Sequence, residues 1–232
     1  MMPEVYLVPC VLDETATNTI PLYIIDAVKK CQVIFAENER TARRFLKSMD
    51  KAIVIDDYEW FAIHKAEEEQ VNNFKQKLKE GKNIAIISEA GCPGIADPGQ
   101  ILIEAAHELN ALIKPLVGPS SILLALMASG MNGQQFQFVG YLPIDHNERI
   151  KTIKELELYS EKKHSAQIFI ETPYRNNQLI ETLLKTCKSN TKICIAAELT
   201  AANEYIKTKT VSEWRKEKTD FHKKPVIFLL QA

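Results

Sequence analysis

The 232-residue sequence lacks the glycine-rich motifs of common phosphate sites and the clustered cysteines and histidines of common metal sites. It contains neither G-x-G-x-x-G nor G-x-x-x-x-G-K-[ST], which excludes the common dinucleotide and P-loop motifs. Its five cysteines are scattered without a C-x-x-C and its five histidines are dispersed, so we expect no metal and no disulfide framework. No unbroken apolar run approaches the ~20 residues of a membrane span, so we expect no membrane contact. A net charge of −1 argues against a strongly basic nucleic-acid binder, although a local basic patch is compatible with it.

The composition is typical of a globular protein, with 46% hydrophobic and 25% charged residues. The first residues show no basic segment followed by an apolar run, so no signal peptide is expected. Reduced, buried thiols are the simplest interpretation of the cysteines, and they predict a cytoplasmic protein.

Apolar runs and helical periodicities alternate along the chain, which predicts two α/β domains, at 1–117 and 118–232. We expect a mostly parallel sheet in the first domain and a mixed sheet in the second. The predicted strands lie at 5–10, 32–36, 52–55, 84–88, 112–117, 136–141, 165–171, 192–197, 204–210 and 225–230. The predicted helices include 18–30, 38–49, 65–80, 122–128 and 146–159, with one more after Gly99 and one after Pro173.

The chain is organised around the stretch S-E-A-G-C-P-G-I-A-D-P-G at 88–99, which lies between a predicted strand and a predicted helix. Ligands bind at such carboxyl ends of strands in open α/β sheets, and glycine lets a backbone approach a ligand closely. The stretch contains no Lys or Arg, so a ligand with little negative charge fits it best. Asp97 is expected to cap the following helix, with Pro98 in its first turn. A purely structural turn is the alternative.

This stretch resembles the S-D-A-G-x-P-x-x-x-D-P-G segment of the tetrapyrrole methylase superfamily, and it is most similar to the branch that 2′-O-methylates a cytidine of small-subunit ribosomal RNA. Further segments resemble the family in order and spacing. They are Y-L-V-P at 6–9, L-V-G-P-S-S at 116–121, F-V-G-Y-L-P at 138–143, I-F-I-E-T-P-Y-R at 168–175 and A-E-L-T at 197–200.

The resemblance implies S-adenosylmethionine as the cofactor, held in a cleft between two α/β domains, and it implies a homodimer. The positive sulfonium and ammonium of that cofactor agree with a loop lacking cations. Helix capping is the alternative role for Ser120 and Thr172. The implied cofactor contacts are Pro9, Ser88, Ala90, Gly91, Cys92, Ile95, Ser120, Ser121, Glu171, Thr172, Leu199 and Pro225.

The predicted helix 38–49 carries a basic stripe formed by Arg40, Arg43, Arg44 and Lys47. By itself this stripe is typical of a solvated helix face. The family motif A-E-D-T-R-x-T-R falls on 36–43 and implies that Arg40 and Arg43 contact RNA phosphates. By the same resemblance, we expect Tyr174 and Arg175 to contact the substrate.

Methylation of a ribose hydroxyl requires removal of a proton, and a carboxylate can act as the base. We name Glu37 and Glu89 as candidates, with an ordinary salt bridge or a solvated acid as the alternative for each. The dispersed histidines and the absence of a recognisable partner for the Ser120 hydroxyl argue against a hydrolase. A nucleophilic role for Cys92 is remote.

Several positions depart from the family pattern. Glu89 and Asn38 each stand where the family has Asp, and Cys92 stands where it has Thr. The family's T-P-I-G-N after the first strand is C-V-L-D-E here, its Arg and Lys around E-L-T are Ala197 and Ala201, and its last G-E is replaced at 224–225 by K-P. Most of these changes avoid the loop 88–99 and fall at positions that could face the substrate, so we infer that methyl-donor binding is retained and that the acceptor is the part open to change. From the resemblance we expect a methyltransferase whose acceptor is RNA. A small molecule such as a tetrapyrrole, or a paralogue that binds the cofactor without catalysis, is the alternative.

Overall fold

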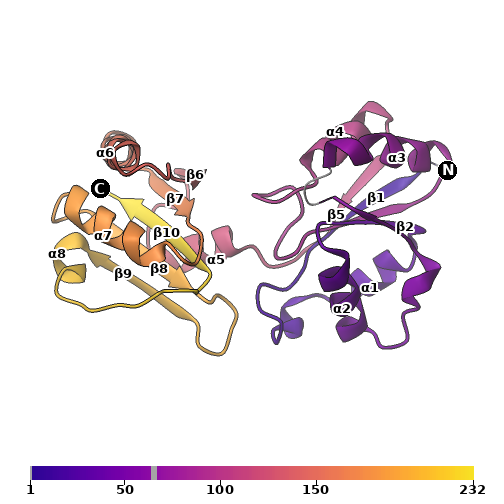
Figure 1. Cartoon of the computed structure of the whole chain (residues 1–232), viewed down its shortest axis with the longest axis horizontal. Helices are drawn as coiled ribbons and strands as arrows, with labels where there is room; N and C mark the ends of the chain where they lie inside the picture. Colours follow the sequence, from indigo (N-terminus) through magenta and orange to yellow (C-terminus); the bar gives the residue numbers. More distant parts are fainter. Residues whose placement is uncertain (1, 64–66) are drawn as a thin grey trace. The chain divides into compact units, whose positions relative to one another are not determined.

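The computed structural model describes residues 2–63 and 67–232. The chain divides into two compact units, Met1–Ser120 and Ser121–Ala232 (Figure 1).

The first unit is built on a five-stranded, fully parallel sheet with the order β3-β2-β4-β1-β5. Its strands are β1 (Glu4–Val8), β2 (Val33–Ala36), β3 (Glu59–Ala62), β4 (Ile84–Ile87) and β5 (Leu112–Pro115). Every residue of β2 and β4 is buried, as expected for central strands covered on both faces. All five strands are parallel, so their carboxyl ends meet along one edge of the sheet.

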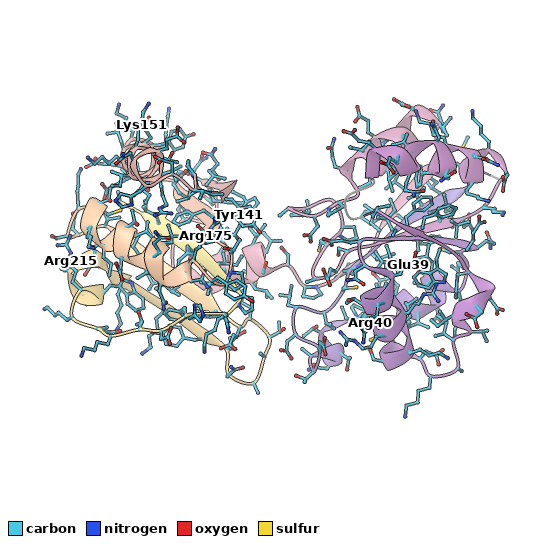
Figure 2. All side chains as sticks on the ribbon, in the orientation of Figure 1. Glu39, Arg40, Tyr141, Lys151, Arg175 and Arg215 are labelled. Carbon is cyan, nitrogen blue, oxygen red and sulfur yellow. The ribbon has the colours of Figure 1, made fainter. Side chains whose placement is uncertain are left out.

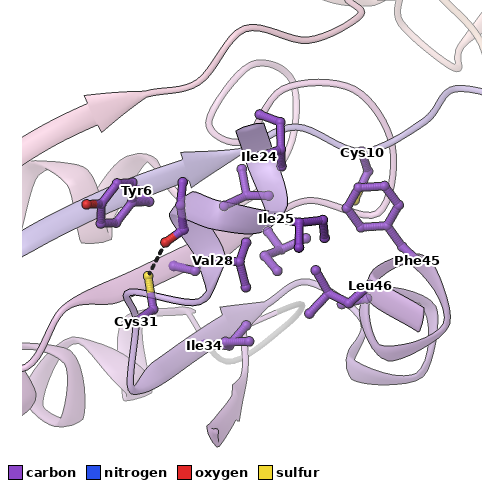
Figure 3. Packing of buried hydrophobic residues seen from close by; sticks show 14 of the residues in the cluster. Tyr6, Cys10, Ile24, Ile25, Val28, Cys31, Ile34, Phe45 and Leu46 are labelled. Carbon is purple, nitrogen blue, oxygen red and sulfur yellow. Dashed lines mark hydrogen bonds between the residues drawn. The ribbon is translucent and has the colours of Figure 1, made fainter. Parts of the chain in front are cut away.

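Helices cover both faces of this sheet, with α1 and α2 on one face and α3 and α4 on the other (Figure 1). The helices are α1 (Tyr23–Val28), α2 (Glu39–Met49), α3 (Glu67–Lys79) and α4 (Gln100–Glu108). Helix α2 carries Glu39 and Arg40 (Figure 2). Its apolar stripe packs Phe45 and Leu46 against Ile24 and Val28 of α1 (Figure 3).

Two predicted elements differ from the structure. The third strand lies at Glu59–Ala62 and not at 52–55, because the apolar run buries Ile53 in the core as part of a connection and then forms a 3₁₀ turn at Ile55–Asp57. The helix expected at 18–30 is interrupted by Pro21, and it consists of a 3₁₀ turn at Thr17–Thr19 and then α1. The helix expected from residue 65 is described from Glu67, and 65–66 lie outside the described residues.

The second unit contains a mixed sheet with the order β6-β7-β10-β8-β9, which confirms the predicted fold class. Strands β6 and β7 are parallel, and the other neighbours are antiparallel, including the hairpin of β8 and β9. Its strands are β6 (Phe136–Tyr141), β7 (Ala166–Ile170), β8 (Lys192–Ala197), β9 (Tyr205–Thr210) and β10 (Val226–Gln231). Its helices are α5 (Ser121–Ser129), α6 (His146–Lys163), α7 (Asn176–Thr186) and α8 (Val211–Trp214).

Among the described residues, no helix combines the length and apolarity that a bilayer-spanning helix needs.

Candidate cofactor and substrate site

The loop 88–99 leaves β4 at the carboxyl edge of the parallel sheet and folds back onto the residues that follow β1. The Gly91 and Cys10 backbones form a two-way bridge, in which Cys10 N donates to Gly91 O at 2.8 Å and Gly91 N donates to Cys10 O at 3.2 Å. The buried Ser88 hydroxyl donates to Gly91 O at 3.1 Å. The start of the loop is therefore fixed by backbone contacts.

Two glycines allow this close packing. Gly91 has a φ of +69°, and a β-carbon there would lie 3.4 Å from Leu12 Cδ2. A β-carbon at Gly118 would lie 2.3 Å from both Cβ and Cγ of Pro9, closer than any real contact. Cys92 Sγ also donates to Pro119 O at 3.5 Å. Three predicted cofactor residues, Pro9, Gly91 and Cys92, are thus brought together with residues 118–119.

The other predicted cofactor residues of this unit are arranged differently. Ser88 is buried, Ala90 and Ile95 are exposed, and Ser120 is half-buried at the end of the unit. The backbone N–H of Ile95 donates to Cys92 O at 3.3 Å and closes a turn, and the Ile95 side chain at the end of this turn is exposed.

The two candidate bases, Glu37 and Glu89, lie next to one another. Glu89 N donates to Glu37 Oε2 at 2.8 Å, which joins the residue after β2 to the start of the loop. The Glu89 carboxylate accepts hydrogen bonds from Asn38 Nδ2 at 3.3 Å and from Thr41 Oγ1 at 3.2 Å. Thr41 therefore belongs to this site, and sequence reasoning missed it because it occupies a position that the family motif leaves open.

Asp97 does not cap helix α4, so that prediction is wrong. The N-cap residue is Gly99, which has no side chain to cap the helix itself. The Asp97 side chain is instead half-buried, and burial, followed by the charges of Glu37 and Glu89, raises its pKa to about 7. A carboxyl group with a pKa near neutrality is suited to proton transfer. The raised pKa could not be predicted from the sequence, because the acidic residues that contribute to it approach Asp97 only in the folded chain.

The basic stripe on α2 is only partly available to a ligand. Arg43 pairs with Glu39 at 3.2 Å and lies 4.7 Å from the ring centroid of Trp60, and Arg44 pairs with Glu14. In the described part of the chain, exposed Arg40 has no ion-pair partner. A pocket of about 360 Å³ opens beside it, lined by Glu37, Asn38, Glu39, Arg40, Ala62 and Glu89.

In the second unit, Arg175 lies at the start of α7 (Figure 2) and forms a local ion pair with Glu171. The buried Glu171 Oε1 accepts from Thr172 N at 2.7 Å and from Arg175 Nη2 at 2.6 Å. Glu171 Oε2 is buried without a hydrogen-bond partner among the described residues. Tyr174 is 70% exposed.

The remaining predicted contacts of this unit lie at the ends of its helices and strands, with Leu199 after β8, Pro225 before β10 and Ser121 at the start of α5. Glu198 N donates to Pro225 O at 3.0 Å, which brings the residue before Leu199 to Pro225. Leu199 is buried, Pro225 is exposed, and Ser121 is the first residue of α5.

The thiols and the acids form no further reactive centre. Burial raises the pKa of Cys10 and of Cys92, which disfavours the thiolate that a nucleophile needs. No cluster of three or more His, Cys, Asp or Glu side chains suited to a metal ion occurs in residues 2–63 and 67–232.

The loop geometry fits S-adenosylmethionine. The chain is packed so closely here that an added β-carbon at Gly91 or Gly118 would contact or overlap its neighbours, and the loop 88–99 carries the acidic residues Glu89 and Asp97 but no cation. These features favour a ligand that is positively charged and is recognised by backbone groups.

Comparisons with known proteins give the family. The family model of tetrapyrrole (corrin/porphyrin) methylases matches residues 16–214. A "Ribosomal RNA small subunit methyltransferase I" of Buchnera aphidicola subsp. Schizaphis graminum is 31% identical over 230 residues, covering 97% of this chain and 76% of that protein. The protein of the same name from Escherichia coli O157:H7 is 28% identical over 233 residues, covering 99% of this chain and 78% of that protein.

Two solved structures share the fold. The methyltransferase CobJ has a TM-score of 0.65 at 16% identity, covering 98% of this chain and 92% of that chain. The uroporphyrin-III-C-methyltransferase from Thermus thermophilus has a TM-score of 0.57 at 15% identity, covering 100% and 93%. With a family model that matches most of its length, this chain belongs to the tetrapyrrole (corrin/porphyrin) methylases.

Proposed function

We propose that this methyltransferase uses S-adenosylmethionine to methylate the 2′-hydroxyl of a ribose in small-subunit ribosomal RNA. The names of the curated relatives support the acceptor, and the family supports the methyl donor. The observation that carries the proposal is the loop 88–99, which has no cationic side chain and is hydrogen-bonded to Cys10 and Pro119.

The sulfonium of S-adenosylmethionine supplies an electrophilic methyl group. Pro9, Gly91 and Cys92 are the proposed contacts that the structure of the first unit brings together. The remaining proposed contacts are Ser88, Ala90, Ile95, Ser120, Ser121, Glu171, Thr172, Leu199 and Pro225.

The ribose hydroxyl must lose its proton as its oxygen takes the methyl group. Positioning of the hydroxyl in line with the methyl group supplies much of the rate. Glu37 and Glu89 are the two carboxylates predicted for this step, of which we retain Glu37 as the proposed base, and the raised pKa of Asp97 adds a third carboxyl group that could hold the proton. An undiminished single-turnover rate after Glu37→Gln or Glu89→Gln would remove that residue as the base.

The proposed RNA contacts are Arg40, Arg43, Tyr174 and Arg175. Arg40 is the strongest of these, because Arg43 and Arg175 already pair with carboxylates of their own unit. A homodimer and a cytoplasmic location complete the proposal.

A small-molecule acceptor such as a tetrapyrrole is the second candidate. The acidic replacement after β1 favours it, because Glu14 pairs with Arg44 and so neutralises one cation of the basic stripe.

Calorimetry with S-adenosylmethionine and S-adenosylhomocysteine tests the cofactor site. We expect micromolar binding that Gly91→Leu abolishes, because the left-handed φ of +69° strains any side chain there. Transfer of a radioactive methyl group to small-subunit particles reconstituted on an unmodified transcript, compared with transfer to a tetrapyrrole, identifies the acceptor. Absence of cofactor binding at millimolar ligand would leave the non-catalytic paralogue as the better hypothesis.

A further inference from the structure

Two departures from the family motifs are in direct contact. Asn38 and Glu89 each replace an Asp of the pattern, on segments 51 residues apart, and Asn38 Nδ2 donates to Glu89 Oε1 at 3.3 Å. Two aspartates at these positions would bring two like charges together. The amide and the longer carboxylate form a hydrogen bond instead.

This contact belongs to a clamp between helix α2 and the loop 88–99, formed by Asn38, Thr41 and Glu89. Thr41 Oγ1 donates to the same carboxylate oxygen at 3.2 Å. Asn38 Oδ1 at the same time accepts from Thr41 N at 3.2 Å, which caps α2. The Glu89 carboxylate thereby holds the first turn of α2. Arg40 lies on that turn, between Asn38 and Thr41, the two residues that hydrogen-bond to the carboxylate.

The clamp also forms part of a pocket of suitable size and chemistry for one nucleotide. The pocket of about 360 Å³ is lined by both Asn38 and Glu89 and by the exposed Arg40. Arginine recognises a phosphate, whereas carboxylate oxygens accept from the hydroxyl and amine donors of a nucleoside. A nucleotide presents both kinds of group.

We propose that Glu89 is a positioning residue, which through Asn38 and Thr41 holds Arg40 at a pocket that takes one nucleotide of the RNA, and that it is not the base. This inference rests on the proposed function. The two possible roles of Glu89 have different chemical requirements. Positioning requires only a hydrogen-bond acceptor at residue 89, whereas proton removal requires a carboxylate there.

Four variants distinguish these roles, measured as kcat and KM for the reconstituted particle. Glu89→Gln retains an acceptor oxygen for Asn38 and Thr41, so we expect KM to rise by less than about threefold and kcat to stay above about a tenth of the wild-type value, far from the loss expected of a base. Glu89→Ala removes the acceptor, and Asn38→Asp places a carboxylate against it, so we expect KM to rise about tenfold in each with little change in kcat. Asn38→Asp combined with Glu89→Gln exchanges the amide and the carboxylate, and we expect KM to return to within about threefold of the wild type.

Asn147→Asp is the matched control, since it adds the same charge at an exposed position in the first turn of helix α6. It should leave KM unchanged, and thermal unfolding and S-adenosylmethionine binding should show that all variants are folded. A kcat reduced about a hundredfold or more in Glu89→Gln would overturn the proposal in favour of the base. An unchanged KM in Asn38→Asp and Glu89→Ala, or failure of the exchanged pair to restore KM, would also overturn it. A wild-type protein that transfers no methyl group to RNA would overturn the proposed function itself.

Discussion

Gly118 and Pro9 lie so close together that a β-carbon on Gly118 would be 2.3 Å from two carbons of the Pro9 ring. Both residues follow strands of the parallel sheet, β5 and β1, at the edge where the cofactor is proposed to bind. The contact therefore packs the chain tightly at the place where the cofactor is proposed to bind.

Gly118→Ala should consequently destabilise the protein by about 1–3 kcal/mol, because neither the ring nor the backbone can yield without a shift. We also expect weaker binding of S-adenosylmethionine in the calorimeter. Gly133→Ala is the matched control, since nothing lies within 4 Å of an added β-carbon there. Urea unfolding of the two variants measures the difference, and equal free energies of unfolding would show that the contact is unimportant.

The sequence predicted the fold where periodicity and strand runs were strong. The buried runs of β2 and β4 and the helix α2 lie where they were predicted, because the side chains that face the core repeat at the period of the element. The edge strand β3 was missed because its four residues are all partly or fully exposed and its neighbour Ile53 is buried in a connection. Local apolarity does not distinguish a strand from a buried connection.

The sequence predicted the position and the charge of the loop 88–99, but not the contacts that its side chains make in the folded protein. The absence of cations in 88–99 and its place after a buried strand come directly from the sequence. The role of Asp97 depends on Glu37 and Glu89, which approach it only in the folded chain. The bond between Asn38 and Glu89 likewise joins segments that no local pattern relates.

Asp97 makes the stability of the protein depend on pH. Burial and then the charges of Glu37 and Glu89 raise its pKa from 3.8 to about 7 in the folded chain. The folded state therefore binds the proton more tightly than the unfolded state does. The stability contributed by this group is complete below about pH 4 and is lost as the pH rises through about 7.

Asp97→Asn should therefore raise the melting temperature relative to the wild type at pH 8, and the difference should vanish near pH 4. Asp220 offers a control of opposite sign, because the hydrogen bond from Asn177 lowers its pKa. Asp220→Asn should lower the melting temperature at pH 8. A gain for Asp97→Asn that is the same at both pH values would contradict the electrostatic cause.

Arg40 should contribute to the salt dependence of RNA binding. It is exposed on α2 and has no ion-pair partner within the described ranges, so it is available to a phosphate. Each phosphate contact adds about 0.7 to the slope of log affinity against log salt for single-stranded nucleic acid. Arg40→Gln should reduce the slope by about that amount in filter-binding titrations. Lys151→Gln removes the same charge from a side chain that is 79% exposed on α6, and an equal reduction there would show a general charge effect.

The pair of Glu171 and Arg175, which precedes helix α7, should matter more for stability than an exposed pair on that helix. The Glu171 side chain is 1% exposed and that of Arg175 is 29% exposed, and Arg175 Nη2 lies 2.6 Å from Glu171 Oε1. Arg175→Gln leaves the buried carboxylate without its cation, so we expect a loss of about 2 kcal/mol in the free energy of unfolding. Addition of Glu171→Gln should recover part of this loss, because a neutral amide does not need a cation.

The exposed pair is that of Lys185 and Glu181 on α7, which has the same spacing of four residues and side chains 78% and 71% exposed. Lys185→Gln should change the free energy of unfolding by less than about 0.5 kcal/mol, because water and salt screen an exposed pair. Urea titrations of the three variants measure these differences. If Arg175→Gln costs no more than Lys185→Gln, Arg175 is not required to hold Glu171, and its guanidinium is free for the proposed contact with the substrate.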